Sequence, residues 1–428
     1  MKYMIQREIP VVGEYDVVVT GGGFGGFGAA CAAARNGVKV LIIERFAQLG
    51  GMGSVGGVGN FCYHGPMISH GSIFDEVIEK LRRMKVYGRE NGYNPVINTT
   101  YQIADNLTDH NVIPIVLQDI AENSGVQLLF HTEVIDVVKE GSRIDAVIIH
   151  NASGTQAIRA KVFIDGTGTG ITAQHAGAKV LDIHDERHPE MIRASTLMYL
   201  RKVDTEQLQA VLDESCCDEE KDIPKIQYWE EADGKIAFKV HMKHSYDTGS
   251  GLGLSALEQE MRRKVPAFVR YFQRKVNPYY KFDYVPPLMG FREGRRIQGD
   301  YVLTIDDLKG PQTFTDAIAY GNFTVDTVSV RENMPYYQIP MRSLWVKGID
   351  NMFVVGRCLS ADRLAMSAVR IMPTCCLMGQ AAGIAAALAC KQCMDIRKVD
   401  TAKVVELLVS DSAEREVMLK KLRPDAYE

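Results

Sequence analysis

The 428-residue chain lacks the features that mark several special classes of protein. Its formal net charge is only −4 at pH 7, so it offers no basic surface that would indicate a nucleic-acid partner. It contains no run of about 18 apolar residues, and residues 1–14 lack the apolar core of a signal peptide, so we predict neither a membrane span nor a leader. The nine cysteines are unevenly spaced, which favours free thiols in a cytoplasmic protein over a disulfide framework.

Groupings that suit a metal ion are also scarce. Cys390 and Cys393 form a lone C-x-x-C in a helical context, and without a second pair they do not indicate a zinc site. We therefore predict no metal. The remaining composition, 46% hydrophobic and 24% charged, is that of an ordinary globular protein.

What the chain does contain is a glycine-rich unit near its N-terminus. Residues 16–20 (Asp-Val-Val-Val-Thr) are a β-branched run that predicts a buried strand. Residues 21–26 follow with the pattern G-x-G-x-x-G, and an alanine-rich helical stretch then stops at Gly37, which suits a left-handed helix end. A second buried strand at 38–43 ends at Glu44. This order of strand, glycine turn, helix, strand and acid is typical of a dinucleotide-binding unit.

Each position in this unit has a physical role. Gly21 permits a tight turn, Gly23 lets the backbone approach a pyrophosphate, and Gly26 lets the helix pack closely on the strand. The helix N-terminus offers N–H groups and a positive dipole end to the phosphates. Glu44 stands where an acid accepts a hydrogen bond from a ribose 2′-hydroxyl, so we predict FAD or NAD ahead of NADP. The alternative is an ordinary glycine-rich turn between a strand and a helix.

A second glycine-rich stretch, residues 49–65, follows this acid. Its many glycines exclude a stable helix or strand and suit a backbone pressed against a flat ligand. The interleaved apolar residues, among them Met52 and Phe61, argue against the alternative of a freely solvated loop.

The rest of the chain alternates between predicted helices and strands and then changes character. From about 182 to 335 this alternation is lost and aromatic residues increase, which indicates an inserted domain. The small residues of a helix at 378–389 should pack closely on a sheet or a cofactor. By hydrophobic spacing we predict helices at 72–90 (capped by Ser72), 111–124, 255–276 (capped by Ser255) and 378–389, and strands at 126–130, 131–138, 143–150, 157–164, 195–201, 235–246 and 351–356.

Together these stretches resemble the FAD-dependent oxidoreductases of the glutathione-reductase-like superfamily. More narrowly, they resemble a bacterial FAD-dependent oxidoreductase family often found beside sugar-degrading enzymes. The resemblance covers most of the chain. The motifs that carry it are the G-x-G-x-x-G of residues 21–26 with Ala30 and Glu44, the Leu-Gly-Gly of 49–51, Val134 after Thr132 and Glu133, the second glycine motif at 164–168, the R-E-x-R-R-I-x-G signature at 291–299, and the C-terminal flavin segment at 356–360, 370–374 and 379–383.

The resemblance implies an α/β fold with FAD as the cofactor. A discontinuous Rossmann-type FAD-binding domain is expected from residues 1–182 and 336–394, with an inserted α+β substrate domain at 183–335 and a helical tail at 395–428. The positions that match the family's FAD-binding residues are Gly21, Gly23, Phe24, Gly25, Gly26, Glu44, Arg45, Gly50, Gly51, Met52, Gly56, Gly57, Val134, Gly166, Thr167, Gly168, Gly356, Arg357, Arg370 and Thr374.

The chain departs from the family pattern at several positions. In the second glycine motif, usually A-T-G-D-G, Gly166 replaces the alanine and Thr169 replaces the acid. Arg357 stands where many relatives place an Asp on the ribityl chain, so ribityl contacts are expected from main chain. The first helix is not followed by C-x-x-x-x-C, which argues against a disulfide reductase. A second G-x-G-x-x-G is also missing, so flavin reduction is expected to be driven by the substrate or by an unidentified donor.

The candidate catalytic residues are His64, Arg292 and Arg295. Oxidation of an alcohol or amine needs a base for the heteroatom proton, and the loop of His64 should end near the flavin. The alternative is a histidine that only hydrogen-bonds its own loop. The two arginines form a cluster with Arg296 and Glu293. This cluster either binds an anionic substrate, stabilises reduced flavin, or is an ion-pair network at a domain junction.

We therefore predict an FAD-dependent dehydrogenase or oxidase that moves hydride between a small polar metabolite and flavin N5. The resemblance makes a sugar derivative or hydroxy acid the expected substrate class. Two alternatives stay open: a flavin monooxygenase or halogenase, which would need a reductant, and a flavoprotein subunit for binding or RNA modification, which the missing basic patch disfavours. The expected partners are a small-molecule substrate and an unknown electron acceptor or donor, without nucleic acid or membrane; a homo-oligomer stays open.

Overall fold

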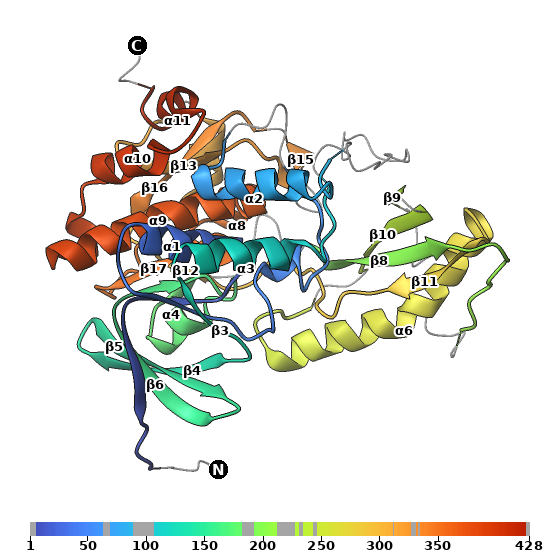
Figure 1. Ribbon diagram of the computed structural model, residues 1–428, viewed down its shortest axis with the longest axis horizontal. Helices are drawn as coiled ribbons and strands as arrows, with labels where there is room; N and C mark the ends of the chain where they lie inside the picture. Colours follow the sequence, from blue (N-terminus) through green and yellow to red (C-terminus); the bar gives the residue numbers. More distant parts are fainter. Residues whose placement is uncertain are drawn as a thin grey trace.

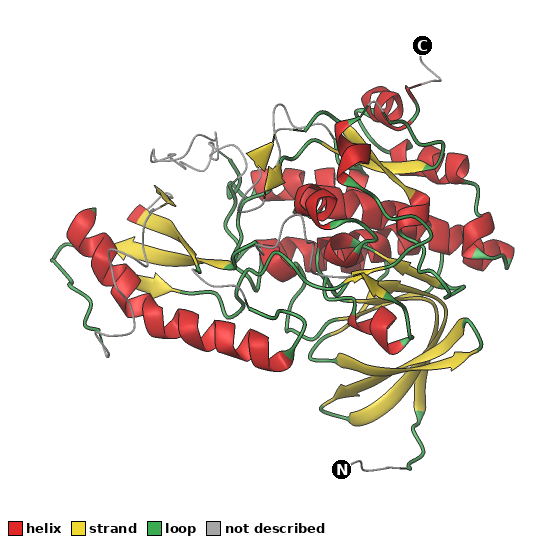
Figure 2. Ribbon diagram, turned by 180° about the vertical axis from the view of Figure 1, so that it is seen from behind, coloured by secondary structure: helices red, strands yellow, loops and turns green. Residues whose placement is uncertain are grey.

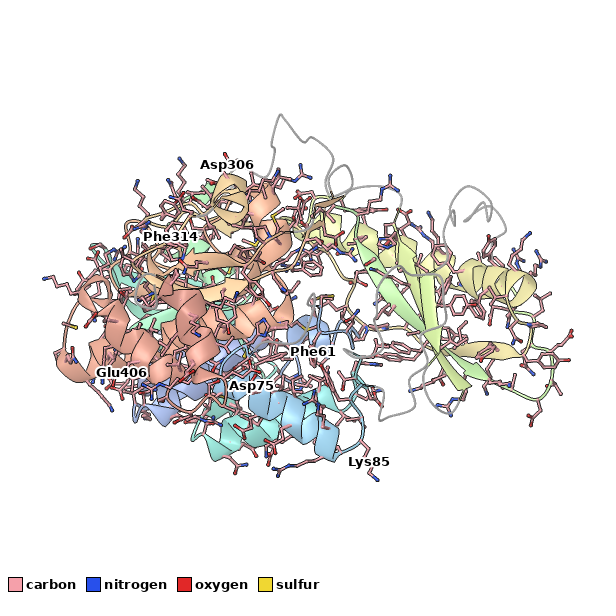
Figure 3. All side chains as sticks on the ribbon, turned by 90° about the horizontal axis from the view of Figure 1, so that it is seen from above. Phe61, Asp75, Lys85, Asp306, Phe314 and Glu406 are labelled. Carbon is pink, nitrogen blue, oxygen red and sulfur yellow. The ribbon has the colours of Figure 1, made fainter. Side chains whose placement is uncertain are left out.

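A computed structural model shows a main body and an arm (Figure 1). The arm consists of strands β8 to β11 and helix α6, within residues 195–284, and it projects from one side of the main body when seen from above (Figure 3). The main body holds the other helices and strands. The structure describes residues 6–62, 69–88, 107–181, 192–211, 227–230, 234–242, 246–310, 312–326, 331–332 and 334–424.

The main body is built on a sheet whose central strands are parallel. Strands buried on both faces must be apolar throughout, and residues 17–19 of β1 are fully buried. The sequence therefore predicted the start of this sheet correctly. In spatial order the parallel strands are β3 (Gln127–Leu129), β2 (Val40–Ile43), β1 (Val11–Thr20), β6 (Gly154–Asp165) and β17 (Met352–Val354).

The first half of β6 belongs to an antiparallel meander. It pairs with β5 (Arg143–Asn151), which pairs with β4 (Glu133–Glu140) at the edge of the sheet. Figure 2 shows these strands extending away from the helices. The sequence predicted the antiparallel pairing of residues 143–150 with 157–164, and in the structure a tight turn with Gly154 at φ 91° joins β5 to β6.

The first helix, α1 (Phe24–Arg35), packs on α9 (Met372–Gln392) with the two backbones in direct contact. A Cβ atom on Gly28 would lie 2.6 Å from the carbonyl oxygen of Cys376, and one on Gly379 or Gly383 would overlap the main chain of α1. α9 is the helix predicted at 378–389, but it is longer. Its small residues pack closely on α1, while the helix also contacts β1 and β6 of the sheet, and the predicted contact with a cofactor stays a prediction.

By length and composition α9 is apolar enough to cross a membrane, although the sequence had predicted no such stretch. In the structure 94% of its apolar window is buried inside the protein. That burial is typical of the core helix of a globular fold, and it accounts for the apolar composition without a membrane.

Two more helices cover α1, namely α2 (Ser72–Arg83) and α3 (Ile113–Asn123). α2 is shorter than the predicted 72–90 because Lys85 adopts a left-handed φ of 57°. Its N-cap is Gly71, so the predicted cap Ser72 is instead the first helical residue. Hydrophobic periodicity thus located both helices but misplaced the ends of α2.

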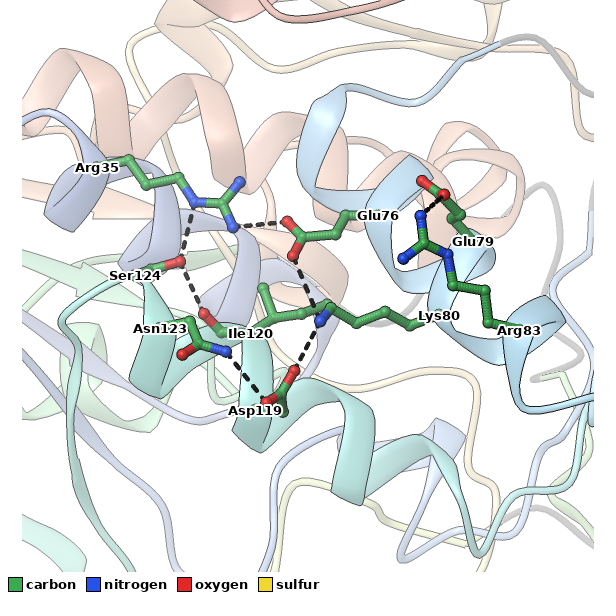
Figure 4. A network of polar contacts seen from close by, with 9 residues as sticks. All are labelled: Arg35, Glu76, Glu79, Lys80, Arg83, Asp119, Ile120, Asn123 and Ser124. Carbon is green, nitrogen blue, oxygen red and sulfur yellow. Dashed lines mark hydrogen bonds and ion pairs between the residues drawn. The ribbon is translucent and has the colours of Figure 1, made fainter.

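Ion pairs on the surface join these three helices (Figure 4). Arg35 of α1 lies 2.6 Å from Glu76 of α2, and Lys80 of α2 lies 2.8 Å from Asp119 of α3. All four side chains are about one-third exposed or more. Because water and salt screen such pairs, each contributes little to stability.

The arm has its own hydrophobic core. Helix α6 (Gly251–Lys275) packs one face onto the sheet, with Phe238, Phe268 and Phe272 fully buried between them. α6 begins earlier than the predicted 255–276 because the Ser250 hydroxyl, rather than Ser255, caps it. The antiparallel sheet has the order β11 (Tyr280–Tyr284), β8 (Ser195–Lys202), β10 (Lys235–His241) and β9 (Gln227–Glu230).

Residues after the arm return to the main body. Apolar side chains of 303–325, which the sequence had assigned to the inserted domain, pack in the main core. So do those of 404–422 in the predicted helical tail. The domain boundaries themselves stay a prediction.

The remaining helices and strands are α4 (Ile171–His175), β7 (Val180–Leu181), β12 (Arg296–Ile297), α7 (Ile305–Lys309), β13 (Ala317–Gly321), β14 (Val325–Asp326), β15 (Arg331–Glu332), β16 (Tyr337–Pro340), α8 (Arg363–Val369), α10 (Thr401–Val409) and α11 (Arg415–Leu422).

Candidate active site

The first glycine motif forms a tight turn between β1 and α1. Gly21 has φ 90°, and a Cβ atom there would lie 2.6 Å from the Thr167 nitrogen. A Cβ on Gly26 would overlap the Gly21 carbonyl oxygen, so this glycine lets the helix pack against the turn. A Cβ on Gly23 would meet one described heavy atom within 4 Å, the Gly166 oxygen at 4.0 Å. Only Gly23 therefore faces open space, where the predicted pyrophosphate would lie.

The start of α1 supplies donors to that space. Gly23 is its N-cap, and no described side chain caps the helix. The first N–H groups of a helix have no partner within the helix and favour an anion. Phe24 and Gly25 begin the helix, and a Cβ on Gly25 would lie 3.4 Å from the Gly356 nitrogen. The first glycine motif and the C-terminal flavin segment thus lie side by side.

Glu44 is held at the end of β2, where the sequence predicted a ribose ligand. Only 5% of the residue is exposed, and its carboxylate accepts hydrogen bonds from Gly22 N at 2.6 Å and Phe46 N at 2.9 Å. Burial raises the pKa of this carboxyl, which the two backbone N–H groups partly offset. A carboxylate has about four lone-pair sites, so acceptor capacity is left for a hydroxyl. Arg45 follows, exposed, with its guanidinium 4.6 Å from the Phe46 ring centroid.

The loop after Glu44 connects the starts of α1 and α9. Gly50 N donates to Gly22 O at 2.8 Å, and a Cβ on Gly51 would lie 3.2 Å from Gly23 Cα. Further along, a Cβ on Gly53 would lie 2.9 Å from the sulfur of Met372, the first residue of α9. The loop therefore runs between the two helix starts, and its contact with the pyrophosphate and flavin stays a prediction.

The same loop contacts the arm and the segment after it. The Tyr199 hydroxyl of β8 donates to Gly57 O at 2.8 Å, and a Cβ on Gly57 would overlap the Pro286 ring. Met52 lies between Gly56 and Gly290, since a Cβ on either glycine would contact its side chain. These glycines are therefore required for close packing here, and any ligand role for them stays a prediction.

The second glycine motif is organised by Asp165, which is fully buried. Its carboxylate accepts hydrogen bonds from the Thr167 nitrogen at 3.0 Å and hydroxyl at 2.6 Å, and from Ala173 N at 3.0 Å. Burial raises the pKa of this carboxyl. A Cβ on Gly166 would lie 2.9 Å from Gly26 Cα, so the two glycine motifs touch. The motif's lost acid at Thr169 is thus not needed to hold the turn.

Arg357 joins three segments. Its Nε donates to the Gly168 carbonyl at 2.9 Å, its Nη1 donates to the Phe291 carbonyl, and its guanidinium lies 4.0 Å from the Phe291 ring centroid. Burial lowers its pKa to about 10. The side chain is therefore held by main-chain carbonyl groups, and the expectation that the ribityl chain is contacted by main chain stays a prediction.

Replacing Arg357 with lysine should lower both the melting temperature and the affinity for FAD. A lysine keeps the charge but cannot reach two carbonyl groups while stacking on a ring. Each hydrogen bond from a charged donor contributes about 1.5–3 kcal/mol. Thermal melting and the flavin content of the purified variant measure the effect. Wild-type values for both would show that the three segments do not depend on this guanidinium.

The start of α9 carries a buried hydroxyl that lacks a partner among the described residues. Thr374, its third residue, is fully buried, and its hydroxyl has no hydrogen-bond partner in the described part of the chain. A Cβ on Gly356, at φ 75°, would meet one described atom, the Cys375 sulfur, at 3.8 Å. Buried polar groups are rarely left unpaired. An orphaned hydroxyl beside an uncapped helix start and open space at Gly356 therefore fits the polar edge of bound FAD.

The predicted arginine cluster is divided between several contacts. Arg292 donates to the Arg193 carbonyl at 2.7 Å, Arg295 donates to the Gly249 carbonyl, and Arg296 donates to the Ala361 carbonyl at 2.8 Å. Arg295 and Arg296 therefore serve at least in part to hold main chain together. Their catalytic or structural role is not decided by this, and His64 lies outside the described residues.

Glu293 pairs with Arg363 of α8, which the sequence did not single out. The pair is bidentate, with one of its two hydrogen bonds 3.0 Å long, and the side chains are 9% and 5% exposed. Glu293 also accepts from Ile192 N at 2.8 Å, and its carbonyl accepts from the Thr248 hydroxyl at 2.7 Å. Glu293, within the signature at residues 291–299, therefore connects α8 to the chain just before the arm and to Thr248 of the arm. Seventy residues separate the partners, so no local pattern signals the pair.

Two further residues that the sequence predicted to bind FAD are Arg370 and Val134. Arg370 ends α8, and its Nη2 lies 3.5 Å from Asp326, while its buried Nε has no acceptor among the described residues. Val134 lies in the edge strand β4, opposite Ile149 of β5. Its predicted contact with adenine stays a prediction.

Comparison with known proteins agrees with this arrangement. A family model described as FAD dependent oxidoreductase matches residues 16–408. Thiamine thiazole synthase of Methanococcus aeolicus is 32% identical over 163 residues, which are 36% of this chain and 55% of that protein. Dihydrolipoyl dehydrogenase of Trypanosoma brucei brucei is 48% identical over 48 residues, 11% of this chain and 10% of that protein. The chain thus spans about half the length of the first relative and a tenth of the second.

Solved structures are similar at lower identity. A geranylgeranyl bacteriochlorophyll reductase-like protein from Thermoplasma acidophilum is 14% identical with a TM-score of 0.47, covering 96% of this chain and 97% of that one. The p-nitrophenol 4-monooxygenase of Pseudomonas putida is 15% identical with a TM-score of 0.46, covering 97% and 88%. Because the family model spans well over half of the chain, the protein belongs to the FAD dependent oxidoreductase family and is an enzyme with FAD as its cofactor.

Proposed function

We propose that the enzyme is a dehydrogenase or oxidase of a small polar metabolite, whose substrate is held between the arm and the flavin site. The observation that supports this is the contact of the arm with the loop of residues 49–62. Tyr199 of the arm donates to Gly57 O, and Met52 lies against Gly290. On this side of the arm, Leu197, Tyr199 and Ala237 pack with Leu107 of the main body, so the arm and the loop are in direct contact and the proposed substrate lies beside this contact.

Bound FAD would supply the hydride acceptor. The chain's own residues bind and orient the substrate and accept the proton that leaves its heteroatom. For that proton His64 remains the proposed base, and for the polar end of the substrate Arg292 is the proposed ligand. The substrate class proposed is a sugar derivative or a hydroxy acid, as the family resemblance suggests.

Anaerobic mixing of the FAD-loaded enzyme with sugars, hydroxy acids and amines, without NAD(P)H, tests this function. We expect at least one of these compounds to bleach the flavin absorbance. Reduction by NAD(P)H alone would instead support the monooxygenase or halogenase alternative. No bleaching by any of them would contradict the proposed substrate class.

Replacing His64 with alanine should slow flavin reduction by about 10²–10⁴-fold if this residue is the base. A base must be unprotonated, so the wild-type rate should fall at acid pH and the variant should lose that fall. Stopped-flow rates between pH 5 and 9 measure both. A matched control is His150→Ala, which removes an exposed histidine of β5. Equal rates for the two variants would remove His64 from the mechanism.

A further inference from the structure

One face of the arm's sheet is turned toward the main body. In β10, Ile236, Phe238 and Val240 pack in the arm's own core against α6. Successive residues of a strand point to opposite faces, so Ala237, Lys239 and His241 share the other face. Ala237 packs there with Tyr199 of β8 and with Leu107 of the main body.

A neighbouring segment brings Arg292 to the same edge. His241 is paired with Ser195 of β8, and Ser195 in turn exchanges two backbone hydrogen bonds of 2.9 Å with Gly290. Arg292 follows two residues later and donates to the Arg193 carbonyl at 2.7 Å. Because Gly290 also lies against Met52, this edge adjoins the loop of the flavin site.

The main body contributes a further cation. Arg370 directly precedes Ile371, the N-cap of α9, and its Nη2 lies 3.5 Å from Asp326. Cys62 is the last residue of the loop of residues 49–62. It lies close enough to Lys239, Arg292, Arg370 and Asp326 to feel the charge of each. Cations from the arm, from the segment after it and from the main body therefore lie around Cys62, together with the carboxylate of Asp326.

His241 lies among charged side chains. Burial by surrounding protein, with Lys239, Arg292 and Arg193 nearby, lowers its pKa to about 3, while the carboxylate of Asp326 opposes this shift. His241 is therefore a neutral imidazole at neutral pH, and the positive charge around it comes from the neighbouring lysine and arginines.

We propose that Lys239, His241, Arg292 and Arg370 form a site for an anionic group of the substrate, a carboxylate or a phosphate. This inference rests on the proposed function, which it narrows from polar to acidic metabolites. Arginine forks suit both oxyanions because they donate two parallel hydrogen bonds, and lysine adds a point charge. His241 is neutral in the empty site and donates one further hydrogen bond through its ring N–H.

The site is tested by titrating the oxidised, FAD-loaded enzyme with acetate, its neutral isostere acetamide, and inorganic phosphate. Changes in the bound-flavin spectrum and in the melting temperature report binding. We expect acetate or phosphate to bind and acetamide not to bind. Tighter binding of phosphate would point to a phosphorylated substrate, and tighter binding of acetate to a carboxylic acid.

Variants locate the binding to this cluster. Lys239→Gln and Arg292→Gln should each raise the anion dissociation constant about tenfold or more. The matched control is Lys235→Gln, which removes the same charge from the same face of β10 about 13 Å away. It should leave the constant unchanged. His241→Asn, a smaller change, provides a further variant if Arg292→Gln does not fold.

The proposal is overturned if acetate and acetamide bind equally, or if no anion changes either signal. It is also overturned if Lys239→Gln and Arg292→Gln, with normal flavin content, keep the wild-type dissociation constant. The titration involves no turnover, so its result is separate from the bleaching test. Anion binding with no bleaching by any compound would leave this site in place and count against the proposed reaction alone.

Discussion

Replacing Gly23 with alanine should leave a folded protein that binds FAD about 10- to 100-fold more weakly. The backbone of Gly23, at φ −66° and ψ 173°, is one that alanine adopts without strain. In the protein alone its Cβ would meet only the Gly166 oxygen, at 4.0 Å. The added methyl group would project into the space in front of α1 where the pyrophosphate must approach the helix N-terminus. Titration of the apoprotein with FAD measures the loss.

The matched variant is Gly26→Ala, three residues later in the first turn of α1. Its Cβ would overlap the Gly21 carbonyl oxygen, so the expected result is a loss of about 1–3 kcal/mol or more in the free energy of unfolding. Urea unfolding of both apoproteins separates the two effects. If Gly23→Ala bound FAD as tightly as the wild type, the pyrophosphate would not pass in front of this residue.

Removing the charge of Arg363 should cost about 3–5 kcal/mol in the free energy of unfolding, because Arg363→Met leaves Glu293 as a buried carboxylate without its cation. The two side chains are 5% and 9% exposed, so water cannot replace the lost partner. Such a loss is a large share of the roughly 5–15 kcal/mol that stabilises a typical domain. Urea unfolding followed by circular dichroism measures it.

The control for this pair lies on the surface. Arg83 and Glu79 of α2 form an ion pair with side chains 75% and 60% exposed (Figure 4), so Arg83→Met should change stability little. The double variant Glu293→Gln with Arg363→Met should recover part of the loss, because it removes the unpaired charge. Equal, small effects of Arg363→Met and Arg83→Met would mean that the pair does not anchor the arm.

The sequence by itself was sufficient for the parts of the fold that depend on neighbouring residues. The unit from residue 16 to Glu44 was predicted correctly because its strands, glycine turn and helix are each encoded locally. Gly21 and Gly26 have the geometric roles expected of them. Local patterns were less reliable at helix ends. Ser72 and Ser255 both looked like caps, but Gly71 and Ser250 occupy the cap positions, since several polar residues near a helix start compete for that role.

Only the tertiary structure decided which distant segments meet. The small residues of α9 predicted close packing but did not identify α1 as the partner. A glycine lets any neighbouring backbone approach closely, so its presence does not say which element will pack there. Glu293 is paired with Arg363, seventy residues further along the chain, because a buried carboxylate is paired by a guanidinium that the fold brings to it. The convergence of Lys239, Arg292 and Arg370 likewise spans the arm and the main body. Such contacts join residues far apart in the chain, so periodicity and motif spacing carry no signal for them.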